Sequence, residues 1–190
     1  MPFLLKAGDV IFSGGDPLAS RHTRRLIKDF LKLKPDAKIS VHTQGYFLDK
    51  QNFAELGITQ LYGASVSINA ATRKTYEKIM RIDAFDRIMK NVEFISEWKK
   101  QGKLKYLNIN FVVHSMNYKE MPAFVKMAEK YDAIAEFWTY NPWRSAEMHK
   151  RYNEVAVFEH WHKDNPKFQK MLKNPIFKSE HCRLDPKLIS

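Results

Sequence analysis

Apolar and polar positions along this chain change repeatedly between a strand-like and a helix-like period. Apolar runs predict five short strands, at residues 10–13, 38–43, 62–69, 107–113 and 134–140. Between them, helical spacing predicts helices at about residues 19–33, 51–56, 72–80, 85–101 and from 121 onward. Strict alternation of strand and helix is typical of right-handed βαβ units, so we expect an α/β fold with a parallel sheet.

Two local patterns refine this outline. Asn117 and Glu120 have the spacing of a capping box, which predicts that their side chains open the helix that follows. Beyond Asn141 the chain becomes rich in aromatic residues and histidine, so we place a domain boundary near residue 142. The sequence thus predicts a barrel-like domain at 1–141 and an extension at 142–190, with a helix at 166–173 and a tail.

Polar residues follow each predicted strand, where parallel sheets bind ligands. The most distinctive are Ser13, Gly14, Gly15, Asp16 and Pro17. Adjacent glycines leave backbone N–H groups open to a ligand, and Asp16 adds a carboxylate. Pro17 would fix the chain direction where a first helical turn starts. This loop is therefore our candidate site for a small anionic or amine-bearing ligand.

Charge and cysteine content limit the alternatives. Lys and Arg outnumber Asp and Glu by 32 to 21, a net charge of +11, which suits an acidic partner such as nucleic acid. The cations are spread over most predicted helices, so we disfavour nucleic acid but keep a basic nucleic-acid-binding domain as an alternative. No apolar run approaches the ~18 residues of a membrane span. The single cysteine, Cys182, fits a reducing compartment, so we expect a cytoplasmic protein.

The Gly-Gly-acid-Pro loop resembles the motif with which radical S-adenosylmethionine (SAM) enzymes hold the SAM amino group. Residues 67–79 are similar to the segment at the family's fourth barrel strand, and 85–94 to the helix that follows it. Residues 110–122 are similar to its fifth strand and the following helix cap. Thr43-Gln44-Gly45 stands where the family commonly has Thr-Asn-Gly. The resemblance covers about residues 9–140, with its motifs in the family's order.

The resemblance implies a partial (β/α) TIM-like barrel of about five βα units, without the family's first unit. Family members reduce SAM with a [4Fe–4S] cluster and release a 5′-deoxyadenosyl radical. By resemblance, Gly14, Gly15 and Asp16 would hold the methionine amino group, and Ser67 and Asn69 would face the ribose or carboxylate. Backbone groups near Thr139 and Tyr140 would border the adenine. The expected cofactor-binding set is completed by Ser13, Pro17, Thr43, Gln44 and Asn110.

The chain departs from the family pattern at several positions. The CxxxCxxC loop is absent, and Cys182 alone cannot supply the three thiolates that the cluster needs. Asn69 replaces the usual Asp, and Gln44 replaces Asn. No histidine has the spacing of a metal site, so we expect no metal ligands and no catalytic residue in this chain.

Three hypotheses about the function remain open. The first is a fragment of a radical SAM enzyme, inactive alone, whose small-molecule or peptide substrate the sequence does not identify. The second is a cluster-less module that binds SAM or another small ligand, and the third is the nucleic-acid-binding domain. We also expect self-association, because the strand at residues 10–13 would present an open apolar edge.

Overall fold

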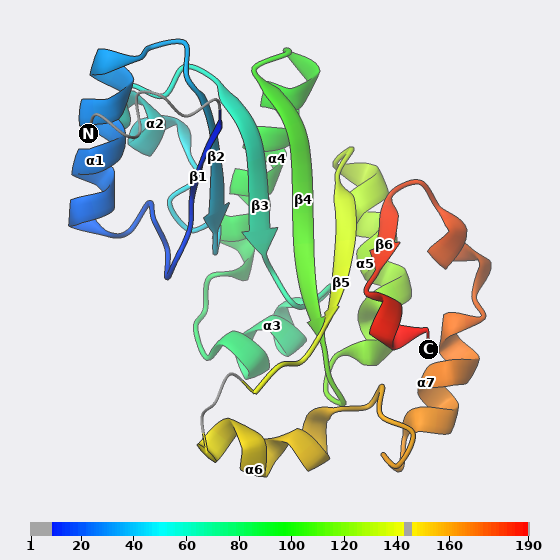
Figure 1. The fold of residues 1–190 in the computed structure, drawn as a ribbon. Helices are drawn as coiled ribbons and strands as arrows, with labels where there is room; N and C mark the ends of the chain where they lie inside the picture. Colours follow the sequence, from blue (N-terminus) through cyan, green and yellow to red (C-terminus); the bar gives the residue numbers. More distant parts are fainter. Residues whose placement is uncertain (1–8, 143–145, 190) are drawn as a thin grey trace. The chain divides into compact units, whose positions relative to one another are not determined.

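The computed structural model describes residues 9–142 and 146–189. Its strands form one sheet in chain order, in which the pairs β1–β2, β2–β3 and β5–β6 are parallel (Figure 1). The strands are β1 (Asp9–Phe12), β2 (Lys38–Thr43), β3 (Leu61–Ser67), β4 (Leu104–Val113), β5 (Ile134–Thr139) and β6 (Cys182–Leu184). The α-helices are α1 (Arg21–Leu33), α2 (Lys50–Leu56), α3 (Arg73–Met80), α4 (Phe85–Lys100), α5 (Met121–Lys130), α6 (Ala146–Val155) and α7 (Asn165–Leu172). The predicted α/β class is confirmed.

The chain divides into two compact units, residues 1–67 with 86–108 and residues 68–85 with 109–190. In the first unit, strands β1 to β3 and the start of β4 associate with helices α1, α2 and α4. Alternate strand residues are fully buried because successive side chains of a strand point to opposite faces. The buried set includes Ile39, Val41, Ala64 and Val66 from the sheet and Ile27, Phe30, Ile88, Val92 and Ile95 from the helices.

One glycine of the first unit is fixed by a tyrosine that lies across the sheet. The Tyr106 hydroxyl lies 3.1 Å from Ser40 Oγ, to which it donates a hydrogen bond. A Cβ added at Gly63 would lie 1.8 Å from Tyr106 Cζ. Position 63 therefore has to be glycine, because the Tyr106 ring lies over it in β3 and reaches Ser40 in β2.

The second unit has an aromatic core. Phe111 of β4, Phe124 of α5 and Phe137 of β5 form a triangle with ring-centroid distances of 4.8, 5.3 and 5.8 Å. Phe177 of the short 3₁₀ helix η3 (Pro175–Lys178) packs on Phe137 at 6.1 Å. This contact ties the C-terminal segment to the sheet, beside the place where β6 pairs with β5.

The structure corrects three local expectations. The segment expected to be a tail contains β6, whose three residues are too few to show a period. Helix α6 was not predicted. Helix α1 begins at Arg21, where the Ser20 hydroxyl accepts from Thr23 N, so Pro17 lies in a preceding turn instead of the first helical turn. The boundary near residue 142 stays a prediction.

The capping-box prediction is wrong. Asn117 makes no side-chain cap, and the 3₁₀ helix η2 (Tyr118–Glu120) precedes α5. The Asn117 amide instead accepts from His114 N at 2.9 Å and donates to the carbonyls of Asn69 and Val112 at 3.0 and 2.9 Å. The box fails because Asn117 is fully buried among backbone groups that need its amide.

Within the described residues, no helix combines the length and the apolar character that crossing a membrane requires.

Candidate functional site

The loop after β1 is open to solvent and depends on two glycines. Ser13, Gly14 and Gly15 are exposed, and the glycine φ angles are +93° and +63°. This left-handed region strains any residue that carries a Cβ. A Cβ added at either glycine would meet no atom within 4 Å, so the space beside the backbone is free for a ligand.

The Asp16 carboxylate joins this loop to the loop after β2. Its Oδ1 accepts from Leu18 N at 3.0 Å and its Oδ2 accepts from Gln44 N at 3.1 Å. The Thr43 hydroxyl lies 3.0 and 2.9 Å from the two oxygens. The structure therefore brings together Asp16, Thr43 and Gln44, three of the residues predicted from the sequence.

Counting protons shows that Asp16 keeps room for a ligand. The Leu18 N–H, the Gln44 N–H and the single Thr43 hydroxyl hydrogen provide three donors, whereas an ionised carboxylate has about four acceptor positions. Gly45 N donates to Thr43 Oγ1 at 2.9 Å, which turns the hydroxyl hydrogen toward Asp16. Counting the donors among the described residues, one acceptor position of Asp16 therefore remains for a donor such as an ammonium group.

The loop after β2 is held rigidly. Gly45 has φ +85°, and a Cβ there would lie 2.8 Å from a methyl group of Val66 and 3.2 Å from one of Ile88. The buried Asn91 amide of α4 donates to the carbonyls of Gly45 and Tyr46 at 2.8 and 3.0 Å. This packing fixes the backbone from which Thr43 and Gln44 reach Asp16. The sequence had not singled out Asn91.

Of the other predicted site residues, Ser67 ends β3, Asn69 follows it and Asn110 lies within β4. Ser67, half-buried, is the last residue of β3 in the first unit. Asn69, in the second unit, has φ +63°, and its Oδ1 accepts from Val112 N at 2.8 Å. The Asn110 carbonyl accepts from the backbone N–H groups of Ile68 and Asn69, each at 3.1 Å. Asn69 thus binds the backbone of β4, and its role toward a ribose stays a prediction.

Thr139, at the end of β5, is fixed by Asp185. Its N–H and hydroxyl both donate to Asp185 Oδ2, at 3.2 and 2.8 Å. Thr139 also lines a cavity of about 720 Å³ within the second unit. The remaining lining residues are Tyr140, Asn141, Pro142, His149, Tyr152, Phe158, Glu159, His160, Asn165, Gln169 and Lys187. The predicted adenine contact of Thr139 stays a prediction.

The cavity has the volume and the mixed lining of a small-molecule pocket. The Tyr152 hydroxyl donates to Glu159 Oε1 at 2.5 Å. Burial, together with this bond to a carboxylate, raises the pKa of Tyr152 to about 12, so the phenol stays a donor. Sequence reasoning missed the cavity because α6, which supplies His149 and Tyr152, was not predicted.

The residues present do not fit an iron–sulfur cluster. Burial raises the pKa of the Cys182 thiol to about 11, which disfavours the thiolate that binds iron. Burial, with a smaller effect of Lys78, lowers the pKa of His114 to about 4, and its Nδ1 accepts from Met116 N at 3.2 Å. Among the residues that the structure describes, no three His, Cys, Asp or Glu side chains gather as a metal site.

Comparison with known proteins finds distant relatives of this chain. No family model matches the chain. A probable GTP 3′,8-cyclase of Saccharolobus islandicus is 28% identical over 120 residues, which are 63% of this chain and 37% of that protein. A second, from Thermoplasma volcanium, is 28% identical over 141 residues, 74% of this chain and 41% of that protein. The crystal structure of Streptococcus suis SuiB bound to S-adenosylmethionine covers 93% of this chain and 39% of SuiB, with TM-score 0.63 and 17% identity.

The chain is related to the radical SAM superfamily. A domain of a pyruvate-formate lyase-activating enzyme from Bacteroides vulgatus shares the fold over 78% of this chain and 92% of that domain, with TM-score 0.51 and 14% identity. The chain spans less than half the length of the GTP 3′,8-cyclases that it matches. The α/β fold described above matches the partial barrels of these radical SAM structures.

Proposed function

We propose that this chain is the SAM-binding part of a radical SAM protein and that the loop from Ser13 to Asp16 holds the methionine end of SAM. One observation carries the proposal. The Asp16 carboxylate, fixed by three donors, keeps one acceptor position beside two glycines whose outer side is open. A carboxylate acceptor beside backbone N–H groups suits an amino acid ligand, because the ligand's ammonium group needs an acceptor and its carboxylate needs donors.

Residues of this loop and of the loop after β2 have separate parts in binding. Asp16 accepts from the methionine ammonium, while Thr43 and Gln44 keep the carboxylate from rotating. Gly14 and Gly15 let the ligand approach the backbone. In a radical SAM enzyme, bound SAM supplies a 5′-deoxyadenosyl radical after it is reduced by a cluster. We propose that this chain performs no such chemistry alone, because its single cysteine is a half-buried thiol whose raised pKa keeps it protonated.

A cluster-less module that binds SAM or a similar ligand is the second candidate. The same cysteine count favours it, and it makes the same use of the loop at Ser13 to Asp16. Reductive cleavage of SAM separates the two candidates. A longer form of the protein that carries a cluster would cleave SAM reductively, whereas a module would bind SAM and return it unchanged.

Isothermal titration of SAM and of S-adenosylhomocysteine into wild type and Gly15→Val tests the proposal. We expect weak binding to wild type and none to the variant, because the valine side chain fills the approach to the backbone. Gly102→Val is the matched control, since Gly102 also has a left-handed φ, +73°, and open space around a Cβ. Both substitutions bring similar backbone strain, roughly 1–2 kcal/mol, and only one lies at the site. Equal binding by wild type and Gly15→Val would show that this loop is not the site.

A further inference from the structure

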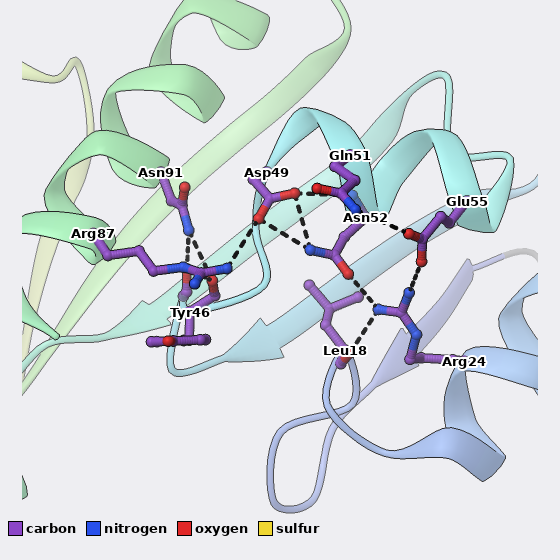
Figure 2. Close-up of polar contacts among 10 residues, drawn as sticks. Leu18, Arg24, Tyr46, Asp49, Gln51, Asn52, Glu55, Arg87 and Asn91 are labelled. Atoms are coloured by element: carbon purple, nitrogen blue, oxygen red, sulfur yellow. Dashed lines mark hydrogen bonds and ion pairs between the residues drawn. The ribbon is translucent and has the colours of Figure 1, made fainter. Parts of the chain in front are cut away.

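Two arginines, Arg24 and Arg87, link helix α2 and its N-cap Asp49 to the two loops that meet at Asp16 (Figure 2). Arg24 of α1 makes the first connection. Its Nη1 donates to the Leu18 carbonyl at 2.9 Å and to Asn52 Oδ1 of α2 at 2.7 Å. Its Nη2 pairs with Glu55, also on α2, at 2.6 Å. The guanidinium thus fixes the end of the first loop to α2.

Asn52 continues this connection toward the second loop. Its Nδ2 donates to both carboxylate oxygens of Asp49, at 2.9 and 3.0 Å, while its Oδ1 accepts from Arg24. Asp49 caps α2 and pairs with Arg87 of α4 at 3.6 Å. Arg87 in turn donates from Nε to the Tyr46 carbonyl at 3.1 Å and covers the Tyr46 ring at 3.9 Å. Figure 2 shows one continuous set of polar contacts from Leu18 to Tyr46.

The two ends of this set are the residues next to the candidate ligand site. Leu18 supplies one N–H group that orients Asp16. Tyr46 follows directly on the Thr43-Gln44-Gly45 segment, which supplies the Gln44 N–H and the Thr43 hydroxyl. Because Leu18 and Asp16 are bonded to each other, a shift of the Leu18 backbone also moves the carboxylate. The Arg24 side chain is only 21% exposed. If it is removed, little water can reach the Leu18 carbonyl and Asn52 Oδ1 to replace the lost hydrogen bonds.

We propose that Arg24 is a positioning residue, which together with Asn52 uses α2 to set the separation of the two loops and thereby the orientation of Asp16. Arg24 touches no ligand in this scheme and acts only through Leu18 and Asn52. The inference rests on the proposed function in so far as the ligand is SAM. The coupling of the two loops is a property of the free protein and can be measured without it.

The test compares Arg24→Met with Arg25→Met. Arg25 is the next residue of α1, with an 87% exposed side chain and one loose ion pair to Asp29 at 3.7 Å, so its variant removes the same charge without touching α2. We expect SAM affinity to fall about tenfold in Arg24→Met and to stay unchanged in Arg25→Met. Tenfold is the lower end of the range, about 10–100-fold, seen when a side chain that orients a ligand-binding residue is lost. Arg24→Lys, which keeps the charge but not the forked geometry, should recover part of the loss.

A double-mutant cycle with Asn52→Leu tests the connection itself. If Arg24 and Asn52 act as one path, Arg24→Met combined with Asn52→Leu weakens binding no more than the stronger single variant. If the losses of SAM affinity in the two single variants multiply in the double variant, the two residues act independently and the path through α2 is overturned. Equal losses in Arg24→Met and Arg25→Met would show a charge effect and would overturn the positioning role.

Amide hydrogen exchange in the ligand-free protein distinguishes this proposal from the proposed function. We expect faster exchange at Leu18 and Gln44, the two N–H donors of Asp16, in Arg24→Met but not in Arg25→Met. If wild type binds no SAM, the proposed function fails, and the exchange data still decide whether Arg24 positions Asp16. Unchanged exchange at both amides in a folded Arg24→Met protein would overturn the inference.

Discussion

Glu120 offers a sharp test of how the second unit is held together. Its carboxylate accepts from the backbone N–H groups of Ala71 and Thr72 at 2.7 and 3.2 Å. It also accepts from the hydroxyls of Thr72 and Thr75 at 2.7 and 2.5 Å. Thr72 is the N-cap of α3, so Glu120 caps a helix nearly fifty residues earlier in the chain instead of its own.

The cost of Glu120→Ala follows from these four bonds. A helix cap contributes about 0.5–2 kcal/mol, and a hydrogen bond to a charged group contributes about 1.5–3 kcal/mol. Thr72 is exposed, so water replaces part of what is lost there. We expect the free energy of unfolding to fall by about 2–3 kcal/mol in Glu120→Ala. Glu120→Gln keeps one acceptor oxygen and should lose about 1 kcal/mol.

Urea denaturation followed by circular dichroism measures these changes, provided that the denaturant dependence of each variant matches that of wild type. Glu93→Ala is the control, because Glu93 is an exposed residue on α4, and its change should stay within about 0.5 kcal/mol. A loss below about 0.5 kcal/mol in Glu120→Ala would refute the reasoning. It would mean that solvent satisfies the α3 N-terminus as well as the carboxylate does.

Three further predictions concern protonation, metal binding and association. Burial lowers the pKa of His114 to about 4, so between pH 6.5 and 4 the unfolded state binds the extra proton and stability falls as the pH falls. The loss reaches about 3 kcal/mol, and in urea titrations at several pH values His114→Gln should flatten that part of the profile. Anaerobic reconstitution with iron and sulfide should yield no stoichiometric [4Fe–4S] cluster, and a cubane spectrum with four irons per chain after desalting would contradict this. Ile11 of the edge strand β1 is 56% exposed, so Ile11→Lys should reduce self-association in sedimentation at several concentrations, whereas a monomeric wild type at high concentration would rule the edge out.

The elements that the sequence predicts correctly are those in which burial follows a single period. Strand β2 was predicted with its observed bounds, because its apolar residues Ile39 and Val41 alternate with polar residues between two turns. Helix α4 has one apolar stripe and ends just before Gly102, as expected. By contrast, the three residues of β6 are too few to show a period, and this strand forms by pairing with β5, as of Cys182 with Ala135.

The candidate site was predictable only in part. Gly14 and Gly15 are visible in the sequence because two adjacent glycines are informative on their own. The meeting of Asp16 with Thr43 follows from the rule that neighbouring parallel strands end at one edge. The Arg24–Asn52 bond joins residues 28 positions apart, so no local sequence pattern predicts it. Such pairings depend on how helices pack, which periodicity does not encode.

The departure from the family pattern at position 69 has a local explanation in the second unit. Asn69 adopts a left-handed φ of +63°, a region where asparagine is enriched among residues other than glycine. Its amide oxygen accepts from Val112 N, while its amide nitrogen lies 3.7 Å from the sulfur of Met80. A carboxylate could accept the first bond, but it has no hydrogen to direct at the sulfur. The amide therefore suits the packing between β4 and α3, so the loss of the family's acid at this position does not by itself argue against SAM binding.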